Sequence, residues 1–145
     1  MRVTRRTTIH SPKVREVMTV ALVATHAQEL LAEIAVRMRD NAVGAVAIMQ
    51  GDELKGIVTE RDLMRATADG VSPRATLASA YMTPDPATII PEVTVEEAAA
   101  RMVALRIRHL PVVEEGRVVG VISARDVLAS GEVSKDLAQL AYEPW

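Results

Sequence analysis

The sequence contains no cysteine and no phenylalanine, and its aromatic residues are Trp145 and two tyrosines. Without thiols the chain forms neither disulfides nor thiolate metal sites, which fits a reducing compartment. The scarcity of aromatic rings argues against stacking of nucleic-acid bases on the protein. The core must therefore be built from aliphatic side chains.

Excess charge of one sign and long apolar runs are also missing. The formal net charge is −2, whereas binding to nucleic-acid phosphates requires a concentrated basic face. No run approaches the roughly 20 apolar residues that span a bilayer, and the basic segment 1–10 lacks the apolar core of a signal peptide. We therefore expect a cytoplasmic protein that binds neither nucleic acid nor a membrane. A salt-sensitive contact of the basic arm, residues 1–12, with an acidic partner or nucleic acid remains the alternative.

The chain contains an internal repeat. When it is shifted by 64 positions without a gap, Met18-Thr19 aligns with Met82-Thr83, and Gly56 aligns with Gly120. The other identities are Glu33 with Glu97, Ala35 with Ala99, Arg37-Met38 with Arg101-Met102, and Arg61-Asp62 with Arg125-Asp126. Self-similarity at a fixed period indicates a duplicated supersecondary unit. Two copies of one pocket-forming unit suggest a binding module with two sites.

Each copy has the pattern of a helix, two strands joined by a turn, and a second helix, preceded by a short extended piece. In the first copy we expect helices at 29–41 and 60–68 and strands at 43–49 and 54–59. In the second copy we expect a helix from Thr94 to about 106, strands at 109–114 and 117–122, and a helix at 123–129. Neither copy alone can bury both faces of its small sheet. We therefore expect an α/β (α+β) fold of two βαββα repeats packed face to face with pseudo-two-fold symmetry, with ligands in the cleft between them.

Composition sets the expected boundaries. The basic arm covers residues 1–12, the first repeat 13–69, the linker 70–76, the second repeat 77–130 and the C-terminal tail 131–145. Within the tail, residues 134–142 have the length of a short helix that would dock on the core or on a partner. The chain is long enough to bury a stable core without covalent staples.

The most specific local feature is a motif of glycine, two apolar residues, a hydroxyl residue, a variable residue, arginine and aspartate. It occurs at 56–62 and at 120–126. The glycine permits close backbone approach. The hydroxyl group lies where a helix begins, and there free N–H groups and the helix dipole suit a phosphate. The aspartate can accept hydrogen bonds from two neighbouring hydroxyls, such as those of a ribose, and Arg61 and Arg125 can donate to phosphate.

The same spacing has a structural interpretation. Serine or threonine followed three residues later by aspartate is also a helix cap that needs no ligand. The two interpretations are compatible, because a capping group can also turn toward a phosphate, and both remain open at this point.

Besides the two motifs, the chain contains the segment 14–19 (VREVMT) and the expected strand 108–113 (RHLPVV). With these features it resembles a tandem pair of cystathionine-β-synthase (CBS) domains, a Bateman module, over about residues 14–129. The resemblance implies regulation rather than catalysis, with no catalytic residue, metal ligand or obligatory cofactor. Such pairs bind AMP, ADP or ATP and sometimes S-adenosylmethionine or NAD-type molecules, commonly form homodimers, and signal through conformation or an effector protein, which here is unknown. The resemblance implies that Thr59 and Ser123 contact phosphate and that Asp62 and Asp126 contact ribose. It further implies that the base and phosphate region is lined by Val43, Gly44 and Ala45 and by Ile107, Arg108 and His109.

The two copies are not identical. Gly44 and Ala45 stand where the second copy has Arg108 and His109, so we expect two unequal sites, and the sequence does not say which one is occupied. The candidates for a dimer face are Leu63-Met64 and Val127-Leu128, with internal packing as the alternative. A second function also remains open, namely a ligand-free dimerisation or interaction scaffold in which the two motifs are only helix caps.

Overall fold

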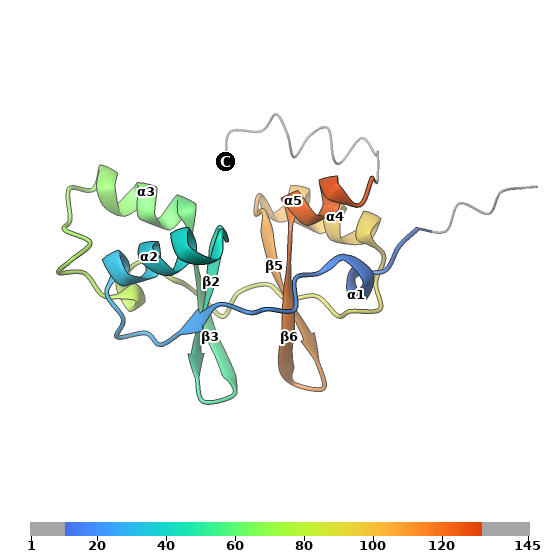
Figure 1. Ribbon diagram of the computed structural model, residues 1–145, viewed down its shortest axis with the longest axis horizontal. Coiled ribbons are helices and arrows are strands. Elements are labelled where there is room, and N and C mark those ends of the chain that lie inside the picture. Colours follow the sequence, from blue (N-terminus) through green and yellow to red (C-terminus); the bar gives the residue numbers. More distant parts are fainter. Residues whose placement is uncertain (1–10, 132–145) are drawn as a thin grey trace, which may run out of the picture.

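The structure is a computed structural model that describes residues 11–131. The chain forms two α+β halves side by side, each with a β-hairpin and two helices near one end of it (Figure 1). The first half contains α2 (Leu31–Asn41), β2 (Ala45–Gln50), β3 (Glu53–Thr59) and α3 (Glu60–Ala68). The second half contains α4 (Val95–Leu105), β5 (His109–Glu114), β6 (Arg117–Ser123) and α5 (Ala124–Ala129). The expected fold of two α+β repeats is confirmed.

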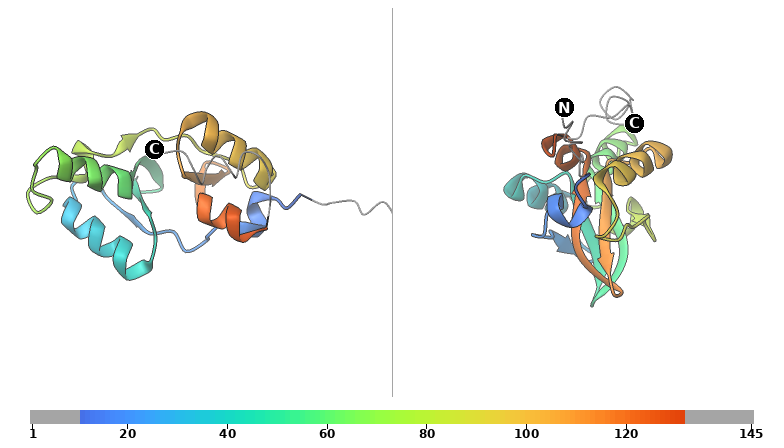
Figure 2. Two further views of the ribbon diagram at one scale, coloured as in Figure 1. Left: turned by 90° about the horizontal axis from the view of Figure 1, so that it is seen from above. Right: turned by 90° about the vertical axis from the view of Figure 1, so that its right-hand side faces the viewer.

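Four short elements lie outside these two sets. They are the helical turn α1 (Val14–Val17), the strand β1 (Ala24–Thr25), the 3₁₀ turn η1 (Ala78–Ala80) and the strand β4 (Thr83–Pro84). The segments that contain them run between the halves, and they pass on opposite sides of the molecule (Figure 2). Neither α1 nor η1 was predicted from the sequence.

Each half borrows an edge segment from the chain that precedes the other half. In the first half, β1 pairs in parallel with β2, and β4 pairs antiparallel with β3, although β4 lies in the leading segment of the second repeat. In the second half, Ile89 forms a parallel bridge with Val112, and Thr19 forms an antiparallel bridge with Val121. Equivalent pairs are related by the 64-residue period. The duplication seen in the sequence is therefore also a duplication of strand pairing.

Two aliphatic clusters form the core, one in each half. The first consists of Leu31, Ile34, Met38, Val46, Ile48, Val58, Ala66 and Ala78. The second consists of Val14, Ile89, Val95, Ala98, Ala99, Met102, Leu110, Val112, Ile122 and Val127. Val14 from α1 thus packs in the second half and Ala78 from η1 in the first. The expected boundaries of the two repeats along the sequence, 13–69 and 77–130, remain a prediction. In space, the segments that lead into the two repeats are exchanged between the halves.

Gly56 and Gly120 lie where the borrowed segments cross β3 and β6. A Cβ atom on Gly120 would lie 2.7 Å from the carbonyl oxygen of Thr19. A Cβ atom on Gly56 would lie 2.7 Å from Sδ of Met82 and 2.9 Å from the carbonyl oxygen of Thr83. The repeated Met-Thr pair and the repeated glycine are therefore two sides of one contact.

Most elements follow the predicted ranges closely, but the first long helix starts later than expected. It was expected from residue 29 and begins at Leu31. The apolar spacing does continue through Leu30, but Leu30 is bridged to Leu77, and the carbonyl of Glu29 accepts a hydrogen bond from Ala78 N–H at 2.8 Å. Backbone pairing with the borrowed segment thus replaces the first helical turn. The helix expected at 134–142 lies outside the described residues.

Replacing Gly120 with alanine should lower the free energy of unfolding by about 1–3 kcal/mol, the usual cost of forcing extra atoms into a packed contact. The added carbon meets a backbone oxygen, which cannot move aside without loosening the bridge between Thr19 and Val121. Urea denaturation measures the loss. Gly116→Ala is the control, because φ there is +75° but nothing lies within 4 Å of the added carbon, so it reports the backbone cost alone. A Gly120→Ala variant as stable as the wild-type protein would contradict this crossing.

Candidate functional site

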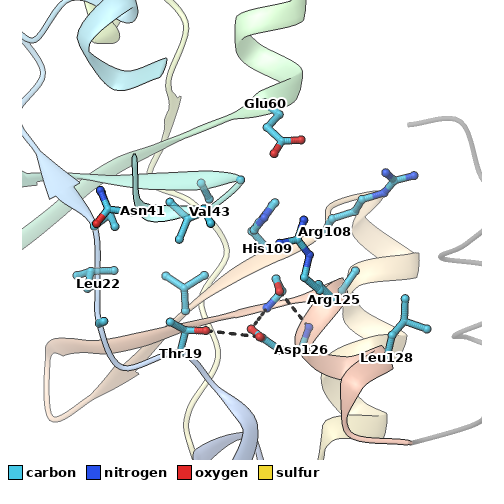
Figure 3. A pocket seen from close by; sticks show the side chains of 18 residues that line it. Thr19, Leu22, Asn41, Val43, Glu60, Arg108, His109, Arg125, Asp126 and Leu128 are labelled. Atoms are coloured by element: carbon cyan, nitrogen blue, oxygen red, sulfur yellow. Dashed lines mark hydrogen bonds between the residues drawn. The ribbon is translucent and has the colours of Figure 1, made fainter. Parts of the chain in front are cut away.

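Two cavities combine the motif of one repeat with the first strand of the other. The Asp126 cavity, of about 570 Å³, is lined by Ser123, Arg125 and Asp126 of the second motif and by residues 43–45 (Figure 3). The Asp62 cavity, of about 530 Å³, is lined by Thr59, Arg61 and Asp62 of the first motif and by residues 107–109. Every site residue predicted from the sequence therefore lines one of these cavities, and Arg108 and His109 line both. Their contact with a ligand remains a prediction.

The corner of the Asp126 cavity is an intact helix cap. The backbone N–H of Ser123 donates to Oδ2 of Asp126 at 2.8 Å, and the N–H of Asp126 donates to Oγ of Ser123 at 3.1 Å. The borrowed segment adds a third contact, because Oγ1 of Thr19 donates to Oδ1 of Asp126 at 3.4 Å (Figure 3). The structural interpretation of the motif is thus correct, and the capping groups also line an open cavity. Capping and ligand binding remain compatible.

The corner of the Asp62 cavity is more buried. The N–H and the hydroxyl of Thr59 both donate to Oδ2 of Asp62, at 2.8 and 3.2 Å, and Asp62 is only 3% exposed. Burial raises the pKa of Asp62, while the Thr59 hydrogen bonds and the charges of Arg65 and Arg61 act in the opposite direction. A carboxylate in this position can accept ligand hydroxyls, provided that its present donors shift.

Arg61, expected as a phosphate donor, also makes a structural contact. Its Nη1 donates to the backbone carbonyl of Arg106 at 3.2 Å. Arg106 follows the last turn of α4 and adopts a left-handed backbone conformation, with φ at +55°. Arg61 thus connects the helix that carries the first motif to the second half of the molecule.

His109 lies at the centre of the Asp126 cavity, between the two halves (Figure 3). Its pKa is lowered to about 4, mainly by burial and in smaller part by the charges of Arg108 and Arg125, whereas the charge of Asp126 opposes the shift. The imidazole is therefore neutral at pH 7 and has both a donor and an acceptor nitrogen.

Sequence reasoning missed several lining residues. Thr19 lines the Asp126 cavity and Thr83 the Asp62 cavity, and the repeat itself marked both as an identical pair. Glu60 lines both cavities. It occupies the variable position of the motif, where the second copy has Ala124, and no pattern in one sequence singles it out.

The four dimer-face candidates divide into two groups. Val127 belongs to the second core cluster, and Leu63 packs against the first, so internal packing is the correct interpretation for both. Met64 and Leu128 are 57% and 53% exposed, and each lines one cavity. These two remain the candidates for contact with another molecule.

Within residues 11–131, no helix is both long and apolar enough to cross a membrane. In the same range, no group of three or more His, Asp or Glu side chains could hold a metal ion.

Sequence comparison identifies relatives of the whole repeat pair. The family model described as "CBS domain" matches residues 14–69 and 78–131. The CBS domain-containing protein YhcV of Bacillus subtilis is 30% identical over 126 residues, which cover 86% of this chain and 89% of that protein. An uncharacterised protein of Methanopyrus kandleri is 36% identical over 103 residues, which cover 69% of this chain. The match spans only 53% of that relative's length.

Solved structures with the same fold agree with this result. The CBS-domain containing protein ATU1752 from Agrobacterium tumefaciens matches with a TM-score of 0.79 at 28% identity, covering 86% of this chain and 97% of that one. The CBS domain pair of protein MJ0100, solved in complex with 5′-methylthioadenosine and S-adenosyl-L-methionine, matches with a TM-score of 0.76 at 23% identity. That match covers 84% of this chain and 98% of the other, and at this identity it shows the fold alone.

The partly buried His109 predicts a stability that falls in mild acid. In the unfolded chain the pKa of histidine is near 6.5, and in the folded protein that of His109 is about 4. Between these values the unfolded chain binds more protons, so the free energy of unfolding falls as the pH drops from about 6.5 toward 4. Between pH 7 and pH 5, His109→Gln should lose about 1–2 kcal/mol less than the wild-type protein. Urea denaturation at the two pH values measures the difference, with His26→Gln as the control at an exposed position, and equal losses in all three proteins would contradict the prediction.

Proposed function

The chain belongs to the CBS-domain family, and from this we propose that it is a non-enzymatic cytoplasmic regulator that binds an adenosine-containing ligand between its repeats. The observation that carries the proposal is that both hydroxyl-and-aspartate corners line open cavities. A motif that served only as a cap would not require a cavity in front of it.

The dimensions and polar groups of the cavities suit a nucleotide. Each volume lies within the range of about 300–1,000 Å³ that is typical of small-molecule sites. Each cavity combines a carboxylate that can accept from a diol, a helix N-terminus beside a hydroxyl, and arginines that can donate to phosphate. Both ligands named for the MJ0100 CBS pair contain an adenosine group, which supports the same ligand class here. AMP, ADP and ATP are the first candidates, followed by S-adenosylmethionine and NAD-type molecules.

The position of the cavities suggests how binding is transmitted. The walls of each cavity come from both halves, so a bound ligand contacts both and stabilises one relative arrangement of them. Since a ligand shifts an equilibrium only through its differential affinity for two states, the regulatory output is a change in conformation or in affinity for an effector protein.

Asp126→Asn and Asp62→Asn should each weaken adenosine-ligand binding at their own cavity by about 1–3 kcal/mol, or roughly 5–150-fold. The amide keeps the side-chain volume and much of the cap but removes the charged acceptor for the ribose hydroxyls. Calorimetric titration with AMP, ADP, ATP, NADH, S-adenosylmethionine and methylthioadenosine measures the effect. Asp52→Asn, in the exposed turn between β2 and β3, is the matched control. If none of these compounds bound at millimolar concentration, the proposal would be wrong.

The ligand-free scaffold is the second candidate, because the hydrogen bonds of a complete cap are already formed at Ser123 and Asp126. Ser123→Ala distinguishes the two functions. As a cap residue alone, Ser123 would contribute about 0.5–2 kcal/mol to stability, and its loss would leave every ligand response unchanged. A nucleotide site predicts that the same substitution also weakens binding.

We also propose that the protein forms a homodimer through the surface that contains Met64 and Leu128. Both are apolar and more than half exposed, and they occupy equivalent positions in the two repeats. Met64→Glu and Leu128→Glu should shift the molar mass measured by light scattering toward that of a monomer, while Val36→Glu on α2 is the control. A wild-type protein that is monomeric at high micromolar concentration would contradict the proposal.

A further inference from the structure

Three side chains, Glu60, Arg108 and His109, line both cavities; we call them the shared wall. At the equivalent positions of the other repeat, the residues are Ala124, Gly44 and Ala45. All three counterparts are small. The molecule therefore has one set of long polar side chains between its cavities, where exact symmetry would provide two.

The backbone around the shared wall obeys the pseudo-two-fold symmetry. The N–H of Glu60 donates to the carbonyl of Gly44 at 3.1 Å, and the N–H of Ala124 donates to the carbonyl of Arg108 at 2.8 Å. These bonds are equivalent under the 64-residue period. The asymmetry thus resides in the side chains alone.

The geometry at Gly44 shows where two of these side chains lie. A Cβ atom on Gly44 would be 3.0 Å from Oε1 of Glu60 and 3.1 Å from Nε2 of His109. Both side chains therefore extend over Gly44 into the Asp126 cavity (Figure 3). Exact two-fold symmetry would place both side chains in the Asp62 cavity alone, and they line that cavity as well.

Outside the shared wall, the two cavities are unequal in charge. The Asp62 cavity has Arg61 and Arg65 as cations of its own, whereas the Asp126 cavity has only Arg125. Arg108 can add a further cation to either cavity, and Glu60 contributes a carboxylate to both cavities. An anion in one cavity and an anion in the other would therefore draw on the same guanidinium and imidazole groups.

We propose that the two cavities compete for the shared wall, so that a phosphorylated ligand in the Asp62 cavity weakens binding of a second one in the Asp126 cavity. This inference rests on the proposed function. A phosphate in the Asp62 cavity attracts Arg108 and the N–H of His109 and repels Glu60, which therefore stays over Gly44. The Asp126 cavity loses a cation and keeps a carboxylate, and it then favours an adenosine compound without phosphate. Because coupling between two sites is reciprocal, a phosphorylated ligand in the Asp126 cavity weakens the Asp62 cavity by the same factor.

Calorimetric titration with ATP tests the competition. The wild-type protein should bind one ATP per chain with high affinity and a second one weakly. In the Asp62→Asn variant the Asp62 cavity is impaired, and the Asp126 cavity should there bind ATP at least tenfold more tightly than the wild-type protein binds its second ATP. Adenosine should bind to the protein loaded with one ATP per chain with an affinity close to the one it shows for the Asp62→Asn variant.

A double substitution that restores symmetry provides the second test. Glu60→Ala copies Ala124 and Gly44→Arg copies Arg108, so the Asp126 cavity gains an arginine equivalent to Arg108 and the shared carboxylate is removed. The new Cβ atom meets the flexible end of His109 after Glu60 is gone, which permits a small adjustment. The second ATP should then bind at least tenfold more tightly than in the wild-type protein. Glu33→Ala, at an exposed position on α2, matches the charge change of Glu60→Ala and should leave both ATP affinities unchanged.

Each outcome has a distinct meaning. If the double variant does not fold, Glu60→Ala alone must still strengthen the second ATP site, by a smaller factor. Two independent ATP sites in the wild-type protein, or a second site unaffected by these substitutions, would overturn the competition and leave the proposed function intact. Failure of every adenosine compound to bind would overturn both.

Discussion

The whole arrangement depends on the crossing of two borrowed segments over two glycines. Met18-Thr19 crosses β6 at Gly120, and Met82-Thr83 crosses β3 at Gly56. These contacts hold each leading segment on the opposite half and thereby fix the two motifs toward the other repeat's first strand. A Cβ atom at Gly120 would meet the carbonyl oxygen of Thr19, and one at Gly56 would meet that of Thr83, so a larger residue at either position would push the paired segments apart.

Much of this could be predicted from the sequence, because a gapless repeat records the same local physics twice. The helix at 60–68 and the strand at 109–114 agree with the structure residue for residue, since apolar periodicity and turn residues determine both. The motif also led to residues that line the cavities, such as Thr59 and Asp126. A glycine followed by two core residues and a capping hydroxyl leaves little freedom in where the aspartate lies.

What could not be predicted depends on contacts between distant parts of the chain. The exchange of α1 and η1 between the halves has no signature in periodicity, because a four-residue helical turn is too short to show one. Glu60 was missed for a different reason. Its importance comes from its position above Gly44. From the sequence alone, Gly44 indicates a missing basic residue, whereas in the structure Glu60 and His109 lie above it. The difference between the copies marks where the molecule departs from its own symmetry.

The exchange of leading segments has a consequence for the origin of such a chain. A single copy of the unit would expose an unpaired strand edge and leave one position of its aliphatic cluster empty, as Val14 and Ala78 each fill the cluster of the other half. Two identical single copies would satisfy each other reciprocally, in the manner of an isologous contact. The protein thus has the construction of a symmetric pair of subunits tethered by residues 70–76. In one polypeptide, a residue such as Gly44 or Arg108 stands on one side only, so a joined pair can hold two unequal corners, which two identical subunits cannot.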